Sequence, residues 1–249
     1  MGRGVHRPIQ PFPSRQLLLI RFVTVAGPPS SGKTSVILAT IEHLRAKGLG
    51  VGVVKFDCLS TSDAQSYRRH DVPVQVGLAG NLCPDHFFIT NVEQAVQWGR
   101  QKGFDVLISE SAGLCSRCSP HVRDILAVCV IDNLSGINTP DKLGPMLRFA
   151  DIIVVTKGDI VSQAEREVFY DHIGHVNKLA RIIPVNGITG QGSFALARAV
   201  VQEHDTDTLI GDFLRFSMPS ALCSYCIGQT KIDESFASGN LRRIRFVDR

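Results

Sequence analysis

The sequence predicts an α/β domain in which helices cover both faces of a mostly parallel sheet. Two observations lead to this fold class: strands and helices alternate along most of the chain, and the strands are nearly continuous apolar runs. Such runs are typical of strands that are buried on both faces, as those of a parallel sheet are. We expect a flexible arm at 1–16, one domain at 17–204 and a small cysteine-containing extension at 205–249.

The predicted elements follow one another in regular order. From apolar runs and their boundaries, strands are expected at 17–26, 50–56, 72–76, 104–109, 125–131, 152–156 and 181–185. The helical periodicity predicts helices from the end of a glycine-rich loop to residue 47, and at 63–70, 91–102, 142–149, 165–179 and 193–203. Loops are expected at 80–86 and 110–121, and a basic strand-like piece at 241–247.

Composition restricts the function. The net charge of +4 is mild and the basic residues are scattered, so nucleic acid is not an expected partner. No apolar run reaches the roughly 20 residues that cross a bilayer, and we recognise no secretory signal, so we expect a cytoplasmic protein. Four of the seven cysteines form two Cys-x-x-Cys pairs, which in a reducing compartment favours metal or redox chemistry.

A phosphate-binding loop follows the first predicted strand and precedes a helix. The sequence at 27–34 is Gly-Pro-Pro-Ser-Ser-Gly-Lys-Thr, the spacing of the P-loop of nucleoside triphosphatases. Its glycines let backbone N–H groups converge on one anion, and the helix N-terminus adds positive potential. Lys33 is expected to contact the β and γ phosphates, and Thr34 to bind Mg²⁺. The expected phosphate-site residues are Gly27, Pro28, Pro29, Ser30, Ser31, Gly32, Lys33, Thr34 and Ser35.

A second motif predicts which base is bound. Thr156-Lys157-Gly158-Asp159 ends a predicted strand, at the place where GTPases carry Asn-Lys-x-Asp. Lys157 would lie along the guanine face, and Asp159 would accept hydrogen bonds from the guanine N1–H and N2–H₂. Thr156 replaces the Asn and has no amide, so one contact is in question. We expect GTP, with ATP as an open alternative.

Taken in order, the motifs resemble the GTPases of nickel-enzyme maturation, the HypB/UreG family of the SIMIBI class. The resemblance covers 17–203, and its landmarks are the P-loop, Asp57, Ser62-Asp63-Ala64, Cys83-Pro84-Asp85-His86, Glu110-Ser111-Ala112-Gly113, 151–159 and 186–192. The fourth landmark resembles a metal-binding Cys-Pro-His loop, and 110–118 resembles a Glu-x-x-Gly switch loop. The resemblance implies a homodimer and a client metalloenzyme or accessory protein.

The acids at two strand ends complete the predicted nucleotide site. Asp57 and Glu110 lie where Mg²⁺ and a water are usually held, and the resemblance gives them the metal and catalytic-water roles. The expected catalytic residues are therefore Lys33, Asp57 and Glu110. Asn186 is expected to join Thr156, Lys157 and Asp159 in holding the nucleotide.

Soft ligands at short spacings predict a second metal site for Zn²⁺ or Ni²⁺. The candidate ligands are Cys83, His86, Cys115, Cys118, His121, Cys223 and Cys226. Cys58 and Cys129 are expected in the core. The leading hypothesis is a Mg²⁺-dependent GTPase whose nucleotide-sensitive Cys/His loops bind a metal ion for maturation of a metalloenzyme. An alternative is a nucleotide-gated scaffold in which the two Cys-x-x-Cys pairs hold an iron–sulfur cluster. A small-molecule kinase is a third, less favoured alternative.

Overall fold

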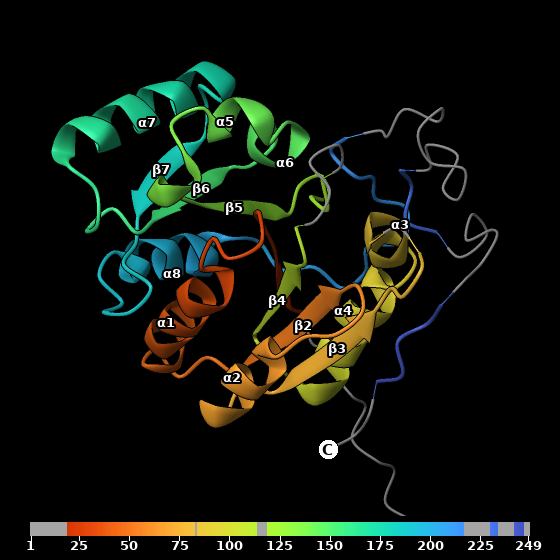
Figure 1. Cartoon of the computed structure of the whole chain (residues 1–249). Helices are drawn as coiled ribbons and strands as arrows, with labels where there is room; N and C mark the ends of the chain where they lie inside the picture. Colours follow the sequence, from red (N-terminus) through yellow and green to blue (C-terminus); the bar gives the residue numbers. More distant parts are fainter. Residues whose placement is uncertain (1–18, 83, 114–118, 217–229, 234–241, 247–249) are drawn as a thin grey trace, which may run out of the picture.

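The computed structural model describes residues 19–82, 84–113, 119–216, 230–233 and 242–246. Its centre is a seven-stranded sheet in which every neighbouring pair is parallel, in the order β3-β2-β4-β1-β5-β6-β7 (Figure 1). The strands are β1 (Arg21–Ala26), β2 (Val51–Asp57), β3 (Val74–Leu78), β4 (Val106–Ser111), β5 (Leu126–Asp132), β6 (Ile152–Thr156) and β7 (Arg181–Pro184). The predicted parallel α/β fold is confirmed.

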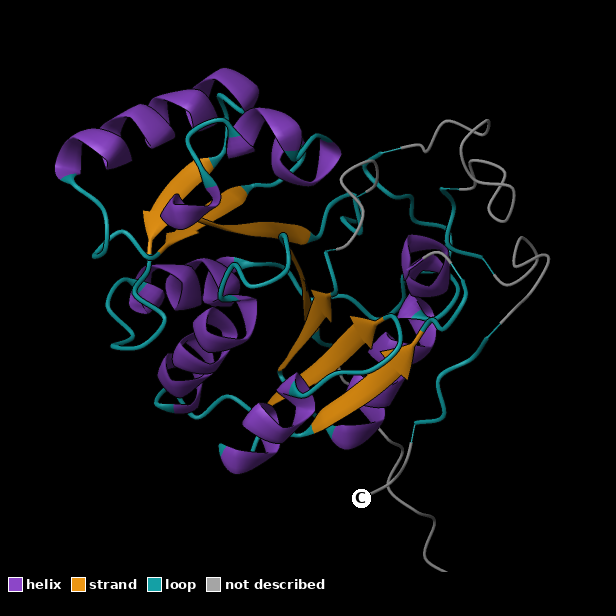
Figure 2. Ribbon diagram, viewed as in Figure 1, coloured by secondary structure: helices purple, strands orange, loops and turns teal. Residues whose placement is uncertain are grey.

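Helices lie on both sides of this sheet, as Figure 2 shows. They are α1 (Lys33–Arg45), α2 (Asp63–Arg69), α3 (Pro84–Ile89), α4 (Val92–Lys102), α5 (Thr139–Lys142), α6 (Pro145–Arg148), α7 (Gln163–Val176) and α8 (Ser193–Gln202). On one face, α1 and α8 pack over the middle of the sheet, and α2 packs against the edge strand β3. On the other face, α3 and α4 cover the β2 side, and α6 and α7 cover the β5–β6 side.

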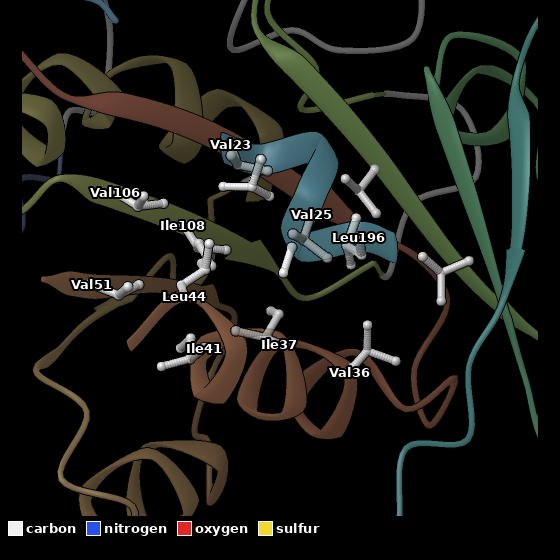
Figure 3. Packing of buried hydrophobic residues seen from close by; sticks show 14 of the residues in the cluster. Val23, Val25, Val36, Ile37, Ile41, Leu44, Val51, Val106, Ile108 and Leu196 are labelled. Atoms are coloured by element: carbon white, nitrogen blue, oxygen red, sulfur yellow. The ribbon is translucent and has the colours of Figure 1, made fainter. Parts of the chain in front are cut away.

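The two-sided burial follows from strand geometry. Successive side chains of a strand point to opposite faces, so Val23 and Val25 of β1 join the cluster under α1 and α8, while Phe22 joins the cluster under α4. Figure 3 shows the first cluster, in which Ile37 and Leu44 of α1 meet the sheet. Both faces of each central strand are thus apolar, which explains the continuous runs in the sequence.

The structure differs from the sequence-based prediction in three elements. The helix expected at 142–149 is two short helices, α5 and α6, because Gly144 adopts a φ of 55° between them. Helix α3 begins inside the loop predicted at 80–86. Residues 242–246 are not a strand; the Asn91 side chain binds them instead, donating to the Arg242 carbonyl and accepting from the Ile244 N–H.

The described parts of 205–249 pack against the domain. Thr206 and Leu214 form antiparallel bridges with Ile20 and Val122, respectively. Leu209 is fully buried in the cluster under α4. Within the described ranges, no helix combines the length and apolar character that crossing a membrane requires.

This packing predicts that the C-terminal segment stabilises the whole domain. Leu209→Ala should lower the free energy of unfolding by about 2–5 kcal/mol, because it removes buried methyl groups and leaves a cavity. Leu179→Ala is the matched control: Leu179 is 97% exposed, so its substitution should change stability by less than about 0.5 kcal/mol. Urea denaturation followed by circular dichroism measures both, and equal effects would show that the segment adds nothing to the core.

Candidate functional site

Two cavities open at the carboxyl ends of the strands, where ligands bind in open parallel sheets. The first, of about 410 Å³, is lined by the P-loop, the end of β2, the start of α2 and the end of β4. The second, also of about 410 Å³, is lined by the segment after β6, by α7 and by the segment after β7. The first fits the predicted phosphate site, and the second fits the predicted base site.

Backbone packing fixes the shape of the P-loop. Gly27 has a φ of 150°, and a Cβ there would lie 2.0 Å from the Val130 carbonyl oxygen. Gly113, in the segment after β4, packs so closely on the P-loop that a Cβ would lie 1.6 Å from the Gly27 oxygen. Both positions require glycine. The P-loop is therefore held between β5 and the segment that follows Glu110.

The N-terminus of α1 offers its amides to an anion. Gly32 precedes the helix with a φ of 90°, and neither a capping side chain nor an acidic residue occupies the first turn. The Lys33 ammonium donates to the carbonyls of Gly27 and Pro28, at 2.9 Å each. Burial lowers the Lys33 pKa to about 8, although the nearby Glu110 charge opposes this. These features suit a bound phosphate chain.

The predicted Mg²⁺ ligands lie in the first cavity. The Thr34 hydroxyl donates to Glu110 Oε1 at 2.9 Å, and Glu110 is fully buried at the end of β4. Asp57 lines the same cavity from the end of β2. Hydroxyl and carboxylate oxygens are the donors that Mg²⁺ prefers, so Thr34, Asp57 and Glu110 would hold that ion together with phosphate oxygens.

Sequence reasoning missed two residues that contact Glu110. The Lys55 ammonium lies 2.6 Å from Glu110 Oε1 and 2.7 Å from Asp63 Oδ2. The Tyr67 hydroxyl donates to Glu110 Oε2 at 2.5 Å, and its pKa is raised well above the ordinary value by burial and by the Glu110 charge. A signal for Lys55 existed, because it is the one basic residue in the otherwise apolar run of β2.

The base motif is arranged differently from the prediction. The buried Thr156 hydroxyl donates to the Ser31 carbonyl at 2.7 Å, so Thr156 joins β6 to the P-loop and is directed away from the base cavity. The Lys157 ammonium also reaches the P-loop, at 2.9 Å from the Ser30 carbonyl oxygen. Asp159 lines the second cavity.

Three further residues line the base cavity. Asn186 is present there, but its Oδ1 accepts from the N–H groups of Ile188 and Thr189, so it shapes its own turn. Arg166 and Tyr170 of α7 also line it and were not predicted. Arg166 donates to the Gly158 carbonyl at 2.6 Å and so supports the segment that carries Asp159.

Comparison with known proteins decides the family. The model of the CobW/HypB/UreG nucleotide-binding domain matches residues 21–184, which is more than half of the chain. The chain belongs to the CobW/HypB/UreG family. An uncharacterised protein of Methanocaldococcus jannaschii is 47% identical over 225 residues, 90% of this chain and 96% of that protein. The urease accessory protein UreG of Mycolicibacterium gilvum is 33% identical over 151 residues, 56% of this chain and 72% of that protein.

Solved structures agree on the fold. HypB from Helicobacter pylori in complex with nickel superimposes with a TM-score of 0.59 at 18% identity, covering 74% of this chain and 86% of that one. The hydrogenase maturation factor HypB from Archaeoglobus fulgidus gives 0.55 at 21% identity, with 73% and 89% covered. The HypB/UreG-like P-loop class predicted from the motifs is confirmed.

Most of the predicted soft-metal ligands of this CobW/HypB/UreG family member lie outside the described residues: Cys83, Cys115, Cys118, Cys223 and Cys226. His86 belongs to α3. Within the described ranges, no group of three or more His, Cys, Asp or Glu side chains is arranged to hold a metal ion by itself. Cys129 is fully buried, as predicted, and burial raises the pKa of its thiol to about 12.

His121 is a core residue, which corrects its prediction as a metal ligand. It is fully buried, and its Nε2 lies 3.2 Å from the Met146 carbonyl oxygen. A carbonyl can only accept, so Nε2 carries the proton, and Nδ1 accepts from the Thr24 hydroxyl at 2.9 Å. Both nitrogens are occupied. Burial, aided by the charge of Arg215 and opposed by that of Asp151, lowers the His121 pKa to about 3.

The His121 environment predicts a pH dependence of stability. Between its unfolded value near 6.5 and its folded value of about 3, the unfolded chain binds a proton that the folded chain excludes. The contribution of the neutral His121 to the free energy of unfolding is complete above pH 6.5. It is lost as the pH falls, by up to about 1.4 kcal/mol per pH unit. Urea denaturation from pH 7 to 4.5 should show that the free energy of unfolding falls less steeply for His121→Gln than for the wild type. The two proteins share all other titrating groups. Parallel curves would contradict the buried neutral imidazole.

Proposed function

We propose that this chain is a Mg²⁺-dependent GTP-binding and hydrolysing protein that uses its nucleotide cycle to deliver a soft metal ion to a client metalloenzyme or its accessory protein. The observation that carries the proposal is the convergence of the P-loop, Glu110 and the Asp159 cavity at one edge of the sheet. Family membership supports it, since relatives include urease accessory proteins and a structural neighbour is a HypB complex with nickel.

On the phosphate side, Lys33 is the group that changes partners. Its ammonium bonds to two P-loop carbonyls, which phosphate oxygens would replace as stronger, charged acceptors. A Mg²⁺ ion held by Thr34, Asp57 and Glu110 would neutralise charge that develops on the β and γ phosphates. Glu110, with Thr34 as its donor, would in addition orient a water molecule near the phosphate chain.

On the base side, Asp159 is the residue that would distinguish guanine from adenine. Its carboxylate lines a cavity whose wall Arg166 and Tyr170 complete, and it is an exposed group that a base could reach. Guanine presents two donors, N1–H and N2–H₂, to such a carboxylate, whereas adenine presents an acceptor at N1. The presence of Thr156 in place of Asn does not weaken this proposal, because the Thr156 hydroxyl donates to the Ser31 carbonyl of the P-loop.

Base selection is the test. Asp159→Asn should lower GTP affinity about 100-fold, because one of two hydrogen bonds is lost and a donor then faces the guanine amino group. The same variant should gain affinity for xanthosine triphosphate, whose C2 carbonyl accepts from the new amide. Lys33→Ala is the control for the phosphates and should lose both nucleotides. Titrations with fluorescent non-hydrolysable analogues measure all three, and equal wild-type affinities for GTP and ATP would contradict guanine selection.

For the metal, the support comes from a small antiparallel ladder on the described residues. The Arg123 N–H donates to the Phe213 carbonyl, and the Arg215 N–H donates to the His121 carbonyl, at 2.8 Å each. On its other side the same segment pairs with 230–232, through the Leu214 N–H and the Thr230 carbonyl at 2.8 Å. Three segments far apart in sequence therefore lie side by side.

Both Cys-x-x-Cys pairs adjoin this ladder in sequence. Cys118 precedes His121 by three residues. Cys223 and Cys226 lie in the sequence between Arg215 and Thr230, and these two residues belong to neighbouring segments of the ladder. We therefore propose that Cys115, Cys118, Cys223 and Cys226 share one Ni²⁺ or Zn²⁺ as cargo, with Cys83 and His86 as the competing site. A homodimer, which the family resemblance implies, stays a prediction.

Metal titration tests this ligand set. Cys118→Ser and Cys223→Ser should each weaken Ni²⁺ or Zn²⁺ binding about tenfold or more, because each removes a thiolate. Cys129→Ala is the matched control, since its thiol is buried in β5. The titrations are repeated with GDP and with a GTP analogue, and an affinity that differs between them supports delivery by the nucleotide cycle.

Three results would redirect the proposal. Loss of binding in Cys83→Ser alone would move the site to the 83–86 segment. Equal metal affinity in both nucleotide states would contradict coupling. Absorbance near 400 nm in anaerobically purified protein, lost in the same two variants, would favour the iron–sulfur scaffold instead.

A further inference from the structure

A lysine occupies the centre of the anionic wall of the phosphate cavity. Lys55 lies in β2, between β3 and β4, and is 2% exposed. Its register partner on β4 is Glu110, so the two side chains leave neighbouring strands on the same face. An ammonium in such a strand costs solvation energy, and it is retained only where anions surround it.

Three carboxylates are the ion-pair partners of Lys55 among the described residues. Its ammonium lies 2.6 Å from Glu110, 2.7 Å from Asp63 and 4.0 Å from Asp57. Burial alone would lower its pKa, but the Glu110 charge and the hydrogen bonds to Asp63 and Glu110 raise it overall. Lys55 therefore places one positive charge among three carboxylates.

The need of Glu110 for hydrogen-bond donors does not by itself explain why a lysine occupies position 55. Oε1 of Glu110 also accepts from Thr34, and Oε2 accepts from Tyr67, so both oxygens have a neutral donor without Lys55. What Lys55 adds is charge. With Lys33 as the second cation, the five charged groups of the cavity wall sum to one negative charge; without Lys55 they would sum to two.

We propose that Lys55 is a tethered cation of the nucleotide site: it neutralises Glu110 and Asp63 in the nucleotide-free chain, so that the anionic triphosphate can enter and Mg²⁺ does not bind ahead of it. This positioning role rests on the proposed function of the cavity. When Mg²⁺ and nucleotide arrive together, the phosphates supply the negative charge that holds the ion, and Lys55 keeps Asp63 and hence α2 next to the site.

The test measures binding of Mg²⁺ and nucleotide separately. Nucleotide-free wild-type protein should bind neither Mg²⁺ nor its paramagnetic substitute Mn²⁺ below millimolar concentration, as followed by calorimetry and by Mn²⁺ spectroscopy. Lys55→Met should bind both ions about tenfold more tightly, and should bind a GTP analogue in EDTA about tenfold more weakly, because the cavity gains a net negative charge. Lys47→Met, at an exposed position, is the charge-matched control and should change neither affinity.

A charge rescue separates this role from a structural one. Lys55→Met combined with Asp63→Asn restores the net charge of the cavity, so it should recover the affinity for the analogue in EDTA and lose the added Mg²⁺ affinity. A merely structural lysine would not be rescued by deleting its partner's charge. Urea denaturation establishes that each variant folds.

The outcomes are distinguishable from those of the proposed function. If the wild type binds no triphosphate even with Mg²⁺, the nucleotide-binding proposal fails. If it does bind, then unchanged affinities in folded Lys55→Met, or an unrescued double variant, overturn the inference about Lys55 alone. Micromolar Mg²⁺ binding to the nucleotide-free wild type also overturns it, and this measurement needs no variant.

Discussion

The buried carboxylate of Glu110 is the interaction on which the nucleotide site depends. It accepts hydrogen bonds from Thr34, Lys55 and Tyr67, which belong to α1, β2 and α2. One anion at the end of β4 thus fixes the helix after the P-loop, the neighbouring strand and the first turns of the next helix. Because an unpaired buried carboxylate costs several kcal/mol, each of these elements is confined to positions from which its donor reaches Glu110.

The second constraint is the close approach of backbones. Gly27 lies against β5 through the Val130 carbonyl, and Gly113 lies against Gly27. These contacts leave no room for side chains, so the P-loop and the segment after β4 cannot move independently. Glu110 and Gly113 are three residues apart, so the Glu110 carboxylate and the backbone contact of Gly113 belong to one short stretch of chain.

The sequence predicts the sheet and the location of the site well, because apolar runs define parallel strands and strand ends converge at one edge. Residues of a local motif, such as Lys33, Thr34 and Asp159, were identified as candidates from the sequence, and all three line the two cavities. Residues whose role depends on tertiary pairing were not identified in this way. The hydroxyl of Thr156 is used by the P-loop, and Tyr67 reaches Glu110 from α2; neither is visible from spacing. His121 has ligand-like spacing from Cys118, but only the fold shows that it is buried.

The core position of His121 supports the proposed coupling between nucleotide and metal. His121 is fixed in the core by Thr24 of β1, and its carbonyl accepts from Arg215 in the ladder, so the chain after Cys118 has a stationary anchor. At the other end, Gly113 touches the P-loop, whose Lys33 would change partners in the proposed nucleotide-bound state. In the proposed function, the sequence from Gly113 to His121, which includes Cys115 and Cys118, begins at a contact with the P-loop and ends at a residue fixed in the core. We propose that a displacement of the P-loop acts on the sequence between Gly113 and His121, while His121 itself stays in the core.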